Sequence, residues 1–218
     1  MEGSVNIGRS ERGLLDRLLG MVVEMDPTFL VIVKHPDKFG PILIVLLTVL
    51  ASIPTTIYGY HTIPSVEGMP DVGRVYFVGV GLIGILIAQV ALLFVRAGVF
   101  TLFSALLGNK ASFKASFSVA GYLQFPSLIA VALGSLSVWI FDKPLSFSLG
   151  SVVSSVQQSS PLGVLLASVS VYSIWYIVLS MFALHHLWAV SKRKALAYTV
   201  IMWSVIVSVG MVAANFTS

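Results

Sequence analysis

The polar side chains that interrupt the apolar stretches of this sequence are the first candidates for chemistry. His185 and His186 are neighbours near the end of one such stretch, and imidazole nitrogens can bind transition metals or transfer protons. Adjacent residues on a helix point about 100° apart, so these two rings are not expected to share one face. Neither has another histidine three or four residues away. The spacing therefore favours interfacial or helix-packing histidines over a metal site.

A second group of polar side chains lies within the apolar stretches: Gln89, Arg96, Tyr172, Trp175 and Tyr176. A charge inside a membrane helix is a functional-site hypothesis by default. Arg96 lies near an end of its stretch, however, where it can snorkel toward phosphates, so anchoring is favoured over transport. The aromatic residues suit either hydrogen bonds between helices or a lipid or small-molecule groove. No Asp or Glu lies in the middle of any stretch, which argues against an ion-coupled transporter.

Three glycines reproduce the spacing of a dinucleotide-binding fingerprint: Gly79, Gly81 and Gly84. That motif needs a preceding strand and an acidic residue about 20 positions on, whereas these glycines lie within an apolar helix. Helix packing explains them better, with Gly84, Ala88 and Ala91 forming a stripe of small residues. There is also no nucleophile elbow, HExxH motif or phosphate loop. We therefore expect no enzymatic activity, no catalytic residue, no cofactor and no metal.

The composition identifies the solvent in which this chain folds. Hydrophobic residues make up 57% of the 218 residues and charged residues only 10%, and the mean hydropathy is +0.96. Soluble domains carry about 25% charged residues, so the chain is an integral membrane protein. The basic residues behind the net charge of +4 lie between the apolar stretches. They indicate membrane orientation and not nucleic-acid binding.

Five apolar segments predict an all-α fold, a bundle of five transmembrane helices over residues 39–218. The spans are expected at about 39–60, 74–107, 115–141, 162–190 and 195–216. The second segment would be ~50 Å long as a helix, against a hydrocarbon core of ~30 Å. Residues 97–107 are therefore expected to form a helical extension at the membrane surface. Pro54 and Pro126 are expected to bend their spans.

Residues 1–38 are predicted to be a cytoplasmic segment with an amphipathic helix at 11–25. Its apolar residues form two adjacent rows: Leu14, Leu18 and Val22, and Leu15, Leu19 and Val23. Such a helix either lies in the membrane interface or packs on the protein's own cytoplasmic face, and the sequence leaves both open. Asp26 and Pro27 are predicted as the N-cap and first turn of a following helix too short to span a membrane.

The orientation follows from the basic residues. Two lie on the side opposite the N-terminus, Arg74 and Lys143, with Arg96 set aside as intramembrane. Ten lie on the same side as the N-terminus: Arg9, Arg12, Arg17, Lys34, Lys38, Lys110, Lys114, Lys192, Arg193 and Lys194. The positive-inside rule then places the N-terminus in the cytoplasm and the C-terminus outside.

Several landmarks are spaced as in one membrane-protein family. Gly108 and the triplet Ser112–Lys114, which includes Phe113, precede a helix that reads Gly121-Tyr122 and then Pro126. Tyr172 to Trp175, followed by 191–195 (SKRKA), supplies a second landmark. Over residues 26–214 the chain resembles the Yip-one domain family, the Ypt/Rab-interacting multi-pass membrane proteins. The resemblance implies five membrane helices, a cytoplasmic N-terminus and no enzymatic activity.

Eukaryotic members of that family act in vesicle traffic and bind Rab-type GTPases and one another. The short N-terminal segment here resembles the prokaryotic members instead, so Rab binding is not expected. We predict a non-enzymatic adaptor or membrane-organising protein of a prokaryotic cell membrane. Its contacts with a protein partner, another copy or anionic lipid would lie at Lys110, Lys114 and Lys192–Lys194. The alternative is a small-molecule or lipid transporter that uses Gln89, Arg96 and the aromatic residues of the fourth span.

Overall fold

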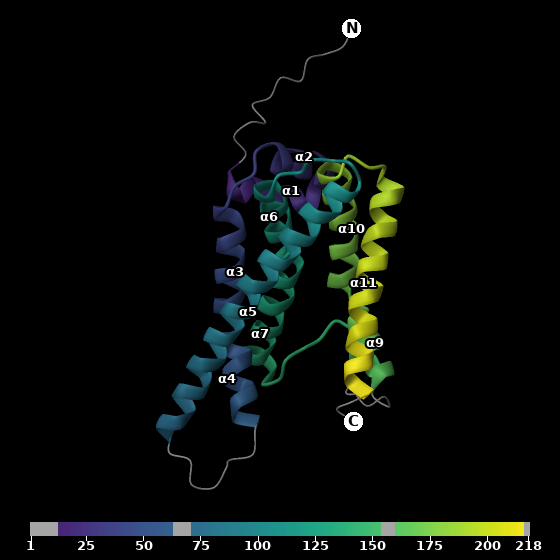
Figure 1. Cartoon of the computed structure of the whole chain (residues 1–218). Helices are drawn as coiled ribbons and strands as arrows, with labels where there is room; N and C mark the ends of the chain where they lie inside the picture. Colours follow the sequence, from purple (N-terminus) through teal and green to yellow (C-terminus); the bar gives the residue numbers. More distant parts are fainter. Residues whose placement is uncertain (1–12, 63–70, 154–159, 216–218) are drawn as a thin grey trace.

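The computed structural model describes residues 13–62, 71–153 and 160–215, and this part of the chain is almost entirely helical (Figure 1). The only β pairing among these residues is an isolated bridge between Ser148 and Ser170. The helices are α1 (Leu14–Val23), α2 (Met25–Lys34), α3 (Phe39–Ala51), α4 (Ile53–Thr62), α5 (Asp71–Leu106), α6 (Phe113–Tyr122), α7 (Phe125–Phe141), α8 (Leu149–Val152), α9 (Pro161–Ser168), α10 (Val171–Leu187) and α11 (Lys192–Asn215).

The two ends of the bundle are built differently. At one end, α1 and α2 lie across the long helices, next to the start of α6, the end of α10 and the start of α11 (Figure 1). We call this the cap end. The far end holds α4, the end of α7, α9 and the last turns of α11. The chain therefore reaches the cap end in α1 and is last described at the far end.

Four segments within the described residues are long and apolar enough to cross a membrane: Phe39–Gly59, Val78–Leu106, Phe113–Phe141 and Lys192–Ala214. The predicted spans at 39–60, 74–107, 115–141 and 195–216 match these four within a few residues. The predicted span at 162–190 has no equivalent among them, and α10 is a shorter apolar helix of 17 residues.

The first and third spans are each interrupted beside the proline that was expected to bend them. α3 ends at Ala51 and α4 begins at Ile53; Ser52 between them, two residues before Pro54, keeps right-handed helical angles. Leu123 and Gln124 separate α6 from α7, and Pro126 lies in the first turn of α7. A proline cannot donate a backbone hydrogen bond to the preceding turn, so each helix ends and restarts there.

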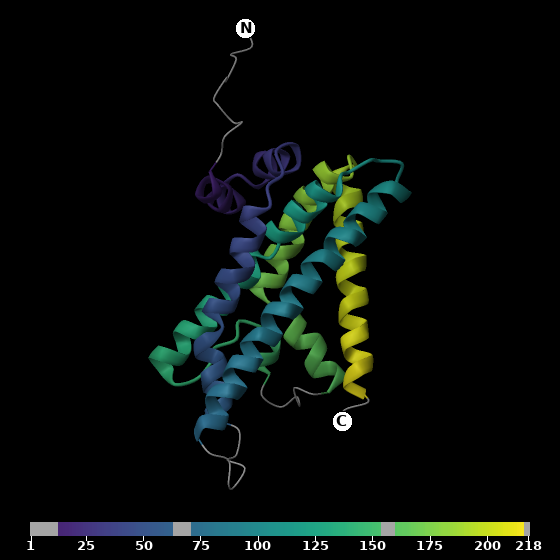
Figure 2. The same cartoon turned by 60° about the vertical axis from the view of Figure 1, so that its left-hand side comes forward.

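The second span is one helix, α5, which begins at Asp71 and crosses the bundle obliquely (Figure 2). Residues 97–106 continue it without a break, and Ala97, Phe100 and Ser104 are buried. The predicted extension is therefore helical, but it packs in the bundle. Gly108, with φ +77°, then ends the helix, and Asn109 donates to the Ser104 carbonyl. This left-handed glycine with a bond back into the last turn is a common C-terminal cap.

The predicted continuous span at 162–190 is wrong, because Val169 and Ser170 separate α9 from α10. Ser170 has extended backbone geometry, its hydroxyl accepts from the amide of Ser173, and the Ser173 hydroxyl accepts from the amide of Ser170. Serine side chains in this arrangement satisfy the free amides of a new helix start. α9 packs on α11, and together α9 and α10 return the chain to the cap end (Figure 2).

The stripe of small residues on α5 does not pack against another of the described helices. Gly84, Ala88 and Ala91 are exposed, and a Cβ added at Gly84 would meet no atom within 4 Å. The predicted helix-packing role of this stripe within the bundle is therefore wrong. α5 contacts α6, α3 and α4 through other residues.

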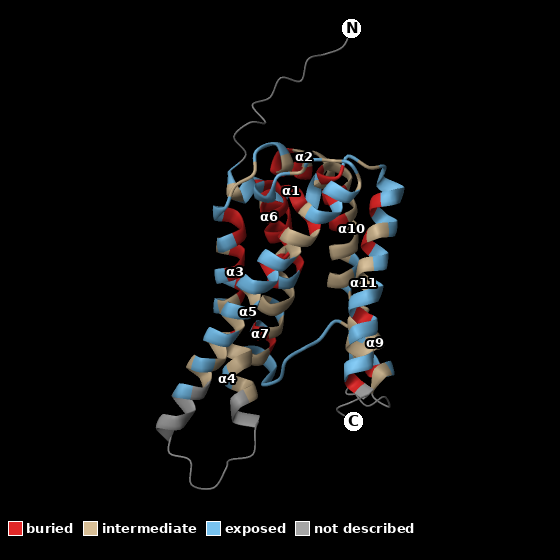
Figure 3. Cartoon of the chain, in the orientation of Figure 1, coloured by how far each residue is buried: buried red, intermediate tan, exposed pale blue. Residues whose placement is uncertain are grey.

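The fully buried side chains are concentrated at the cap end (Figure 3). The largest of them, Trp188, follows α10, and Tyr122 ends α6. Phe29 and Ile32 of α2 belong to the same core. Toward the far end most apolar side chains face outward, as expected where lipid is the solvent.

Candidate functional site at the cap end

Asp37, in the link between α2 and α3, joins the cap to the bundle. The Arg17 guanidinium of α1 forms an ion pair with it, and the Tyr122 hydroxyl of α6 donates to the same carboxylate over 2.8 Å. Its other oxygen accepts the amide of Gly40 at 2.7 Å. Arg17 and Tyr122 are both buried. The carboxylate therefore holds three helices, α1, α3 and α6, at one point.

Two glycines allow this approach of α3 and α6. A Cβ on Gly40 would lie 2.3 Å from the Tyr122 hydroxyl, and a Cβ on Gly121 would lie 2.2 Å from Cβ of Pro41. Both distances are far below van der Waals contact. The Gly121–Tyr122 pair thus combines close backbone contact with a hydrogen bond across helices.

Asp26 forms the second link between cap and bundle. It lies in the first turn of α2, but the helix begins at Met25 after Glu24, so the predicted N-cap role of Asp26 is wrong. Its carboxylate instead lies 2.6 Å from Nε2 of His186 and accepts from Nζ of Lys192 at 2.6 Å. The hydrogen bond from Lys192 lowers the pKa of the Asp26 carboxyl, against an opposing effect of burial; His186 lowers it further. α2, α10 and α11 meet here.

Trp188 is the largest fully buried side chain of this end. Its indole Nε1 donates to the carbonyl of Phe100 in α5 at 2.9 Å, and its ring contacts Phe100, Phe103 and Tyr198. The side chain of Asn109 donates to the Trp188 carbonyl. The turn after α5 and the turn after α10 are therefore in direct contact.

The basic residues predicted for partner contact come together at this end. Lys110 and Lys114 flank the start of α6, and Lys192–Lys194 form the first turn of α11. All five are exposed. Within the described part of the chain, Lys110, Lys114, Arg193 and Lys194 form no ion pair, whereas Lys192 is bound to Asp26. Phe113 and Phe117 pack beside them on Phe94 of α5.

α1 presents two faces. Arg17, Gly20 and Met21 are buried against the bundle. The side chains of Leu15, Leu19, Val22 and Val23 are exposed on the opposite side. Arg17, although charged, lies on the buried side of the helix beside Asp37.

The intramembrane polar residues are not brought together. Gln89 and Arg96 lie on α5, which packs on α6, α3 and α4. α10 packs instead on α11, α2, α7 and α6. There Trp175 contacts Phe125, and Tyr172 contacts Phe147. No single site formed by all five residues is described.

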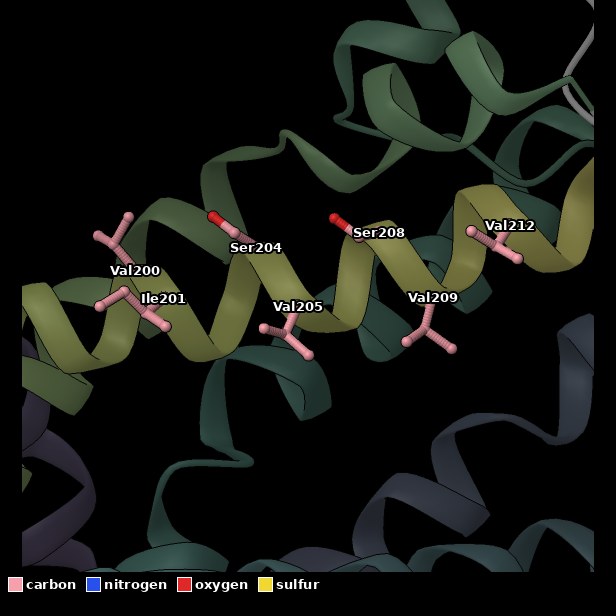
Figure 4. Close-up of a pocket in the computed structure, with 7 residues that line it drawn as sticks. All are labelled: Val200, Ile201, Ser204, Val205, Ser208, Val209 and Val212. Atoms are coloured by element: carbon pink, nitrogen blue, oxygen red, sulfur yellow. The ribbon is translucent and has the colours of Figure 1, made fainter.

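An apolar groove of about 490 Å³ runs along α11 (Figure 4). Its lining residues are Val200, Ile201, Ser204, Val205, Ser208, Val209 and Val212. Two serine hydroxyls are its only polar side chains, and its lining comes from one helix. The groove offers contact to apolar chains and lacks the convergent polar groups typical of a small-molecule site.

Three residues that matter at this end were not singled out from the sequence: Asp37, Asn109 and Trp188. Asp26 was singled out, but as an N-cap and not as a link between helices. The sequence could have drawn attention to Asp37 only because its carboxylate lies directly before an apolar span. Its partners lie 20 and 85 residues away along the chain, so helix periodicity could not identify them.

These features define an all-α integral membrane protein with a packed cap on one end of its helices. The model of the Yip1 domain matches residues 20–214, and the chain belongs to this family. It is also similar to the membrane protein YknW of Bacillus subtilis (strain 168), with 22% identity over 200 residues that cover 87% of this chain and 86% of that protein. No solved structure matches the chain.

Proposed function

We propose that the protein is a non-enzymatic membrane adaptor whose cap end faces the cytoplasm and binds anionic partners through its basic residues. The contact between Asn109 and Trp188 supports this most directly, because it joins the turn bearing Lys110 to the turn before Lys192. Two basic segments that are about 80 residues apart in sequence thereby form one surface.

Two acidic residues of the same end are already paired with basic residues. Asp26 forms an ion pair with Lys192, and Asp37 forms one with Arg17. Each basic residue near an anionic membrane surface contributes about 1 kcal/mol of binding. The exposed leucines of α1 add an apolar face that suits insertion into the same interface.

We further propose that α9 and α10 together form a fifth crossing, which places the two ends of the chain on opposite sides of a prokaryotic cell membrane. The chain has no cysteine, so single cysteines report the topology cleanly. A Ser146→Cys variant at the far end should react with an impermeant maleimide on intact cells. A Ser191→Cys variant should react only after permeabilisation, and equal labelling of both would contradict the arrangement.

The adaptor role is tested by purifying partners from native membranes. The variants Lys110→Gln/Lys114→Gln and Arg193→Gln/Lys194→Gln should each lose a partner that the wild type retains. Lys143→Gln, an exposed lysine at the far end, is the matched control and should keep it. Retention of every partner by both double variants would exclude this surface. Flux through liposomes that is abolished by Gln89→Ala or Tyr172→Phe would instead establish the transporter alternative.

A further inference from the structure

We propose that Asp26, His185 and His186 form a binding site for a transition-metal dication of the Zn²⁺ class. This inference goes beyond the adaptor function and does not depend on it. One ligand atom from each of the three residues lies within 4.8 Å of the other two. The carboxylate comes from α2 and the imidazoles from the last turn of α10.

The two neighbouring histidines converge despite their positions on a helix. Their ring centroids are 4.6 Å apart. His185 directs Nδ1 to the carbonyl of Val190, in the turn that follows the helix, and His186 directs Nε2 to Asp26. The expectation that adjacent histidines point apart is therefore wrong at this position, because the end of the helix lets each ring follow a different partner.

The hydrogen bond of His185 prepares this ring as a ligand. A carbonyl oxygen only accepts, so Nδ1 of His185 carries the proton and Nε2 keeps its lone pair. Metal-binding histidines commonly donate their second ring nitrogen to a backbone carbonyl in this way. Two imidazoles and one carboxylate are a ligand set typical of Zn²⁺ sites that keep an open fourth position.

Metal binding requires side-chain movement and the loss of one proton from His186 Nε2. That nitrogen donates to the Asp26 carboxylate in the metal-free state, so its proton must move to Nδ1 or be released to solvent before Nε2 can bind a metal. Ligands about 2.0–2.1 Å from a tetrahedral Zn²⁺ lie about 3.3 Å from each other. The gap of 2.6 Å between His186 Nε2 and Asp26 Oδ1 must therefore widen, and the His185 ring must rotate to bring its free nitrogen to the metal. All three residues are only partly buried, so rotation about their side-chain bonds is sufficient for this movement.

When no metal is bound, the Lys192 ammonium forms an ion pair with the Asp26 carboxylate. Its Nζ lies 2.6 Å from Asp26 Oδ2 and 4.9 Å from the centroid of the Phe182 ring. The Lys192 side chain is 44% exposed, so it can turn to solvent or rest on the Phe182 ring when a dication arrives. The ammonium and the metal thus compete for one carboxylate. The metal would join α2 to α10 alone, whereas Lys192 joins α2 to α11.

The test is a Zn²⁺ titration of untagged full-length protein in detergent, followed by competition with a chromogenic chelator and by the visible spectrum of Co²⁺. We expect one Zn²⁺ per chain and a tetrahedral Co²⁺ spectrum. His185→Gln, His186→Gln and Asp26→Asn should each weaken binding by more than the 10–100-fold typical of losing an outer-shell partner. His35→Gln, at an exposed histidine after α2, should bind as the wild type does.

Lys192→Gln distinguishes a metal site from an ion-pair network. It keeps all three ligands and removes the competing charge, so Zn²⁺ affinity should rise about tenfold. Zn²⁺ at 100 times its dissociation constant should raise Tm by about 5 °C or more in wild type, but not in Asp26→Asn. Circular dichroism and size-exclusion chromatography verify the fold of each variant. Failure to bind Zn²⁺, binding that persists in His186→Gln, or weaker binding in Lys192→Gln would overturn the site.

Discussion

The cap end and the far end of this bundle are stabilised by different means. At the cap end Trp188, Tyr122 and Phe29 are fully buried, and two carboxylates link α1 and α2 to the bundle. At the far end Trp139 is 76% exposed. There the described side-chain hydrogen bonds are mostly those of serines to nearby backbone groups, such as Ser137 to the carbonyl of Lys143 at 3.1 Å.

The difference reflects the two solvents. Outside the bilayer, water drives apolar burial, as in the core beneath α1 and α2. Along the membrane-facing sides of the helices, lipid tails are as apolar as the side chains and give the helices little reason to bury them. The cap end therefore has both a hydrophobic core and ion pairs. We expect stability to be concentrated there, and matched substitutions at the two ends measure the difference.

The largest effect is expected from Gly121→Ala. The new Cβ would lie 2.2 Å from Cβ and 2.7 Å from Cα of Pro41, so a ring and a backbone would have to move. Overpacking of this kind costs about 3 kcal/mol or more. Gly84→Ala, with no atom within 4 Å, should leave stability unchanged or slightly raised. Thermal unfolding in detergent measures both, and equal losses would remove the distinction between the ends.

Asp37→Asn should cost about 2–3 kcal/mol, because it leaves the buried guanidinium of Arg17 without this carboxylate. Asp142→Asn is the control at the far end. Asp142 is exposed, with φ 51°, a left-handed conformation that asparagine accepts well. The double variant Arg17→Met/Asp37→Asn should lose less than the sum of the single losses. Strict additivity in that double-mutant cycle would show that the two side chains are not coupled.

Trp188→Phe should cost about 1–2 kcal/mol. It removes the hydrogen bond to the Phe100 carbonyl and leaves unfilled space in a closed core. Trp139→Phe, which changes a side chain at the exposed far end, should change stability by less than about 0.5 kcal/mol. Chemical unfolding followed by far-ultraviolet circular dichroism compares the two, and a larger loss at Trp139 would reverse the expected order.

The smallest effect is expected from Gln124→Met. Unlike the preceding cap-end substitutions, it should not lower stability. Gln124 is 3% exposed, and neither end of its amide has a hydrogen-bond partner among the described residues. Methionine has a similar length and no polar group to desolvate, so the variant should be as stable as wild type or about 1 kcal/mol more stable. A clear loss of stability in a thermal melt would indicate that the amide has an unrecognised partner, such as buried water.

The sequence predicted four of the spans and the positions of two interruptions, because long apolar segments and prolines act locally. Pro54 and Pro126 change the backbone within one turn of themselves. The break at Val169 was missed because Ser170 and Ser173 read equally well as polar residues on a continuous helix face. Only their reciprocal bonds show that they start a new helix.

The links at the cap end were beyond sequence reasoning for a different reason. Arg17 has a polar side chain on an amphipathic helix, and periodicity assigns such a residue to solvent. Its burial depends on Asp37, which in turn depends on Tyr122 of α6. Tyr122 is part of a family landmark in the sequence, but no local pattern identifies its hydrogen-bond partner. Tertiary contacts of this kind follow from the packing of the whole bundle.

The sequence distance between Asp26 and its partners has a consequence for the order of assembly. His186 and Lys192 follow Asp26 by 160 and 166 residues. At synthesis rates of about 5–20 residues per second, these two partners of Asp26 are made roughly 8–33 s after Asp26 itself. Arg17 and Asp37, only 20 residues apart, can pair long before. α2 is thus made well before its partner helices α10 and α11, and its contacts are completed only when those helices have been made. Until then Phe29 and Ile32 lack part of the packing that buries them.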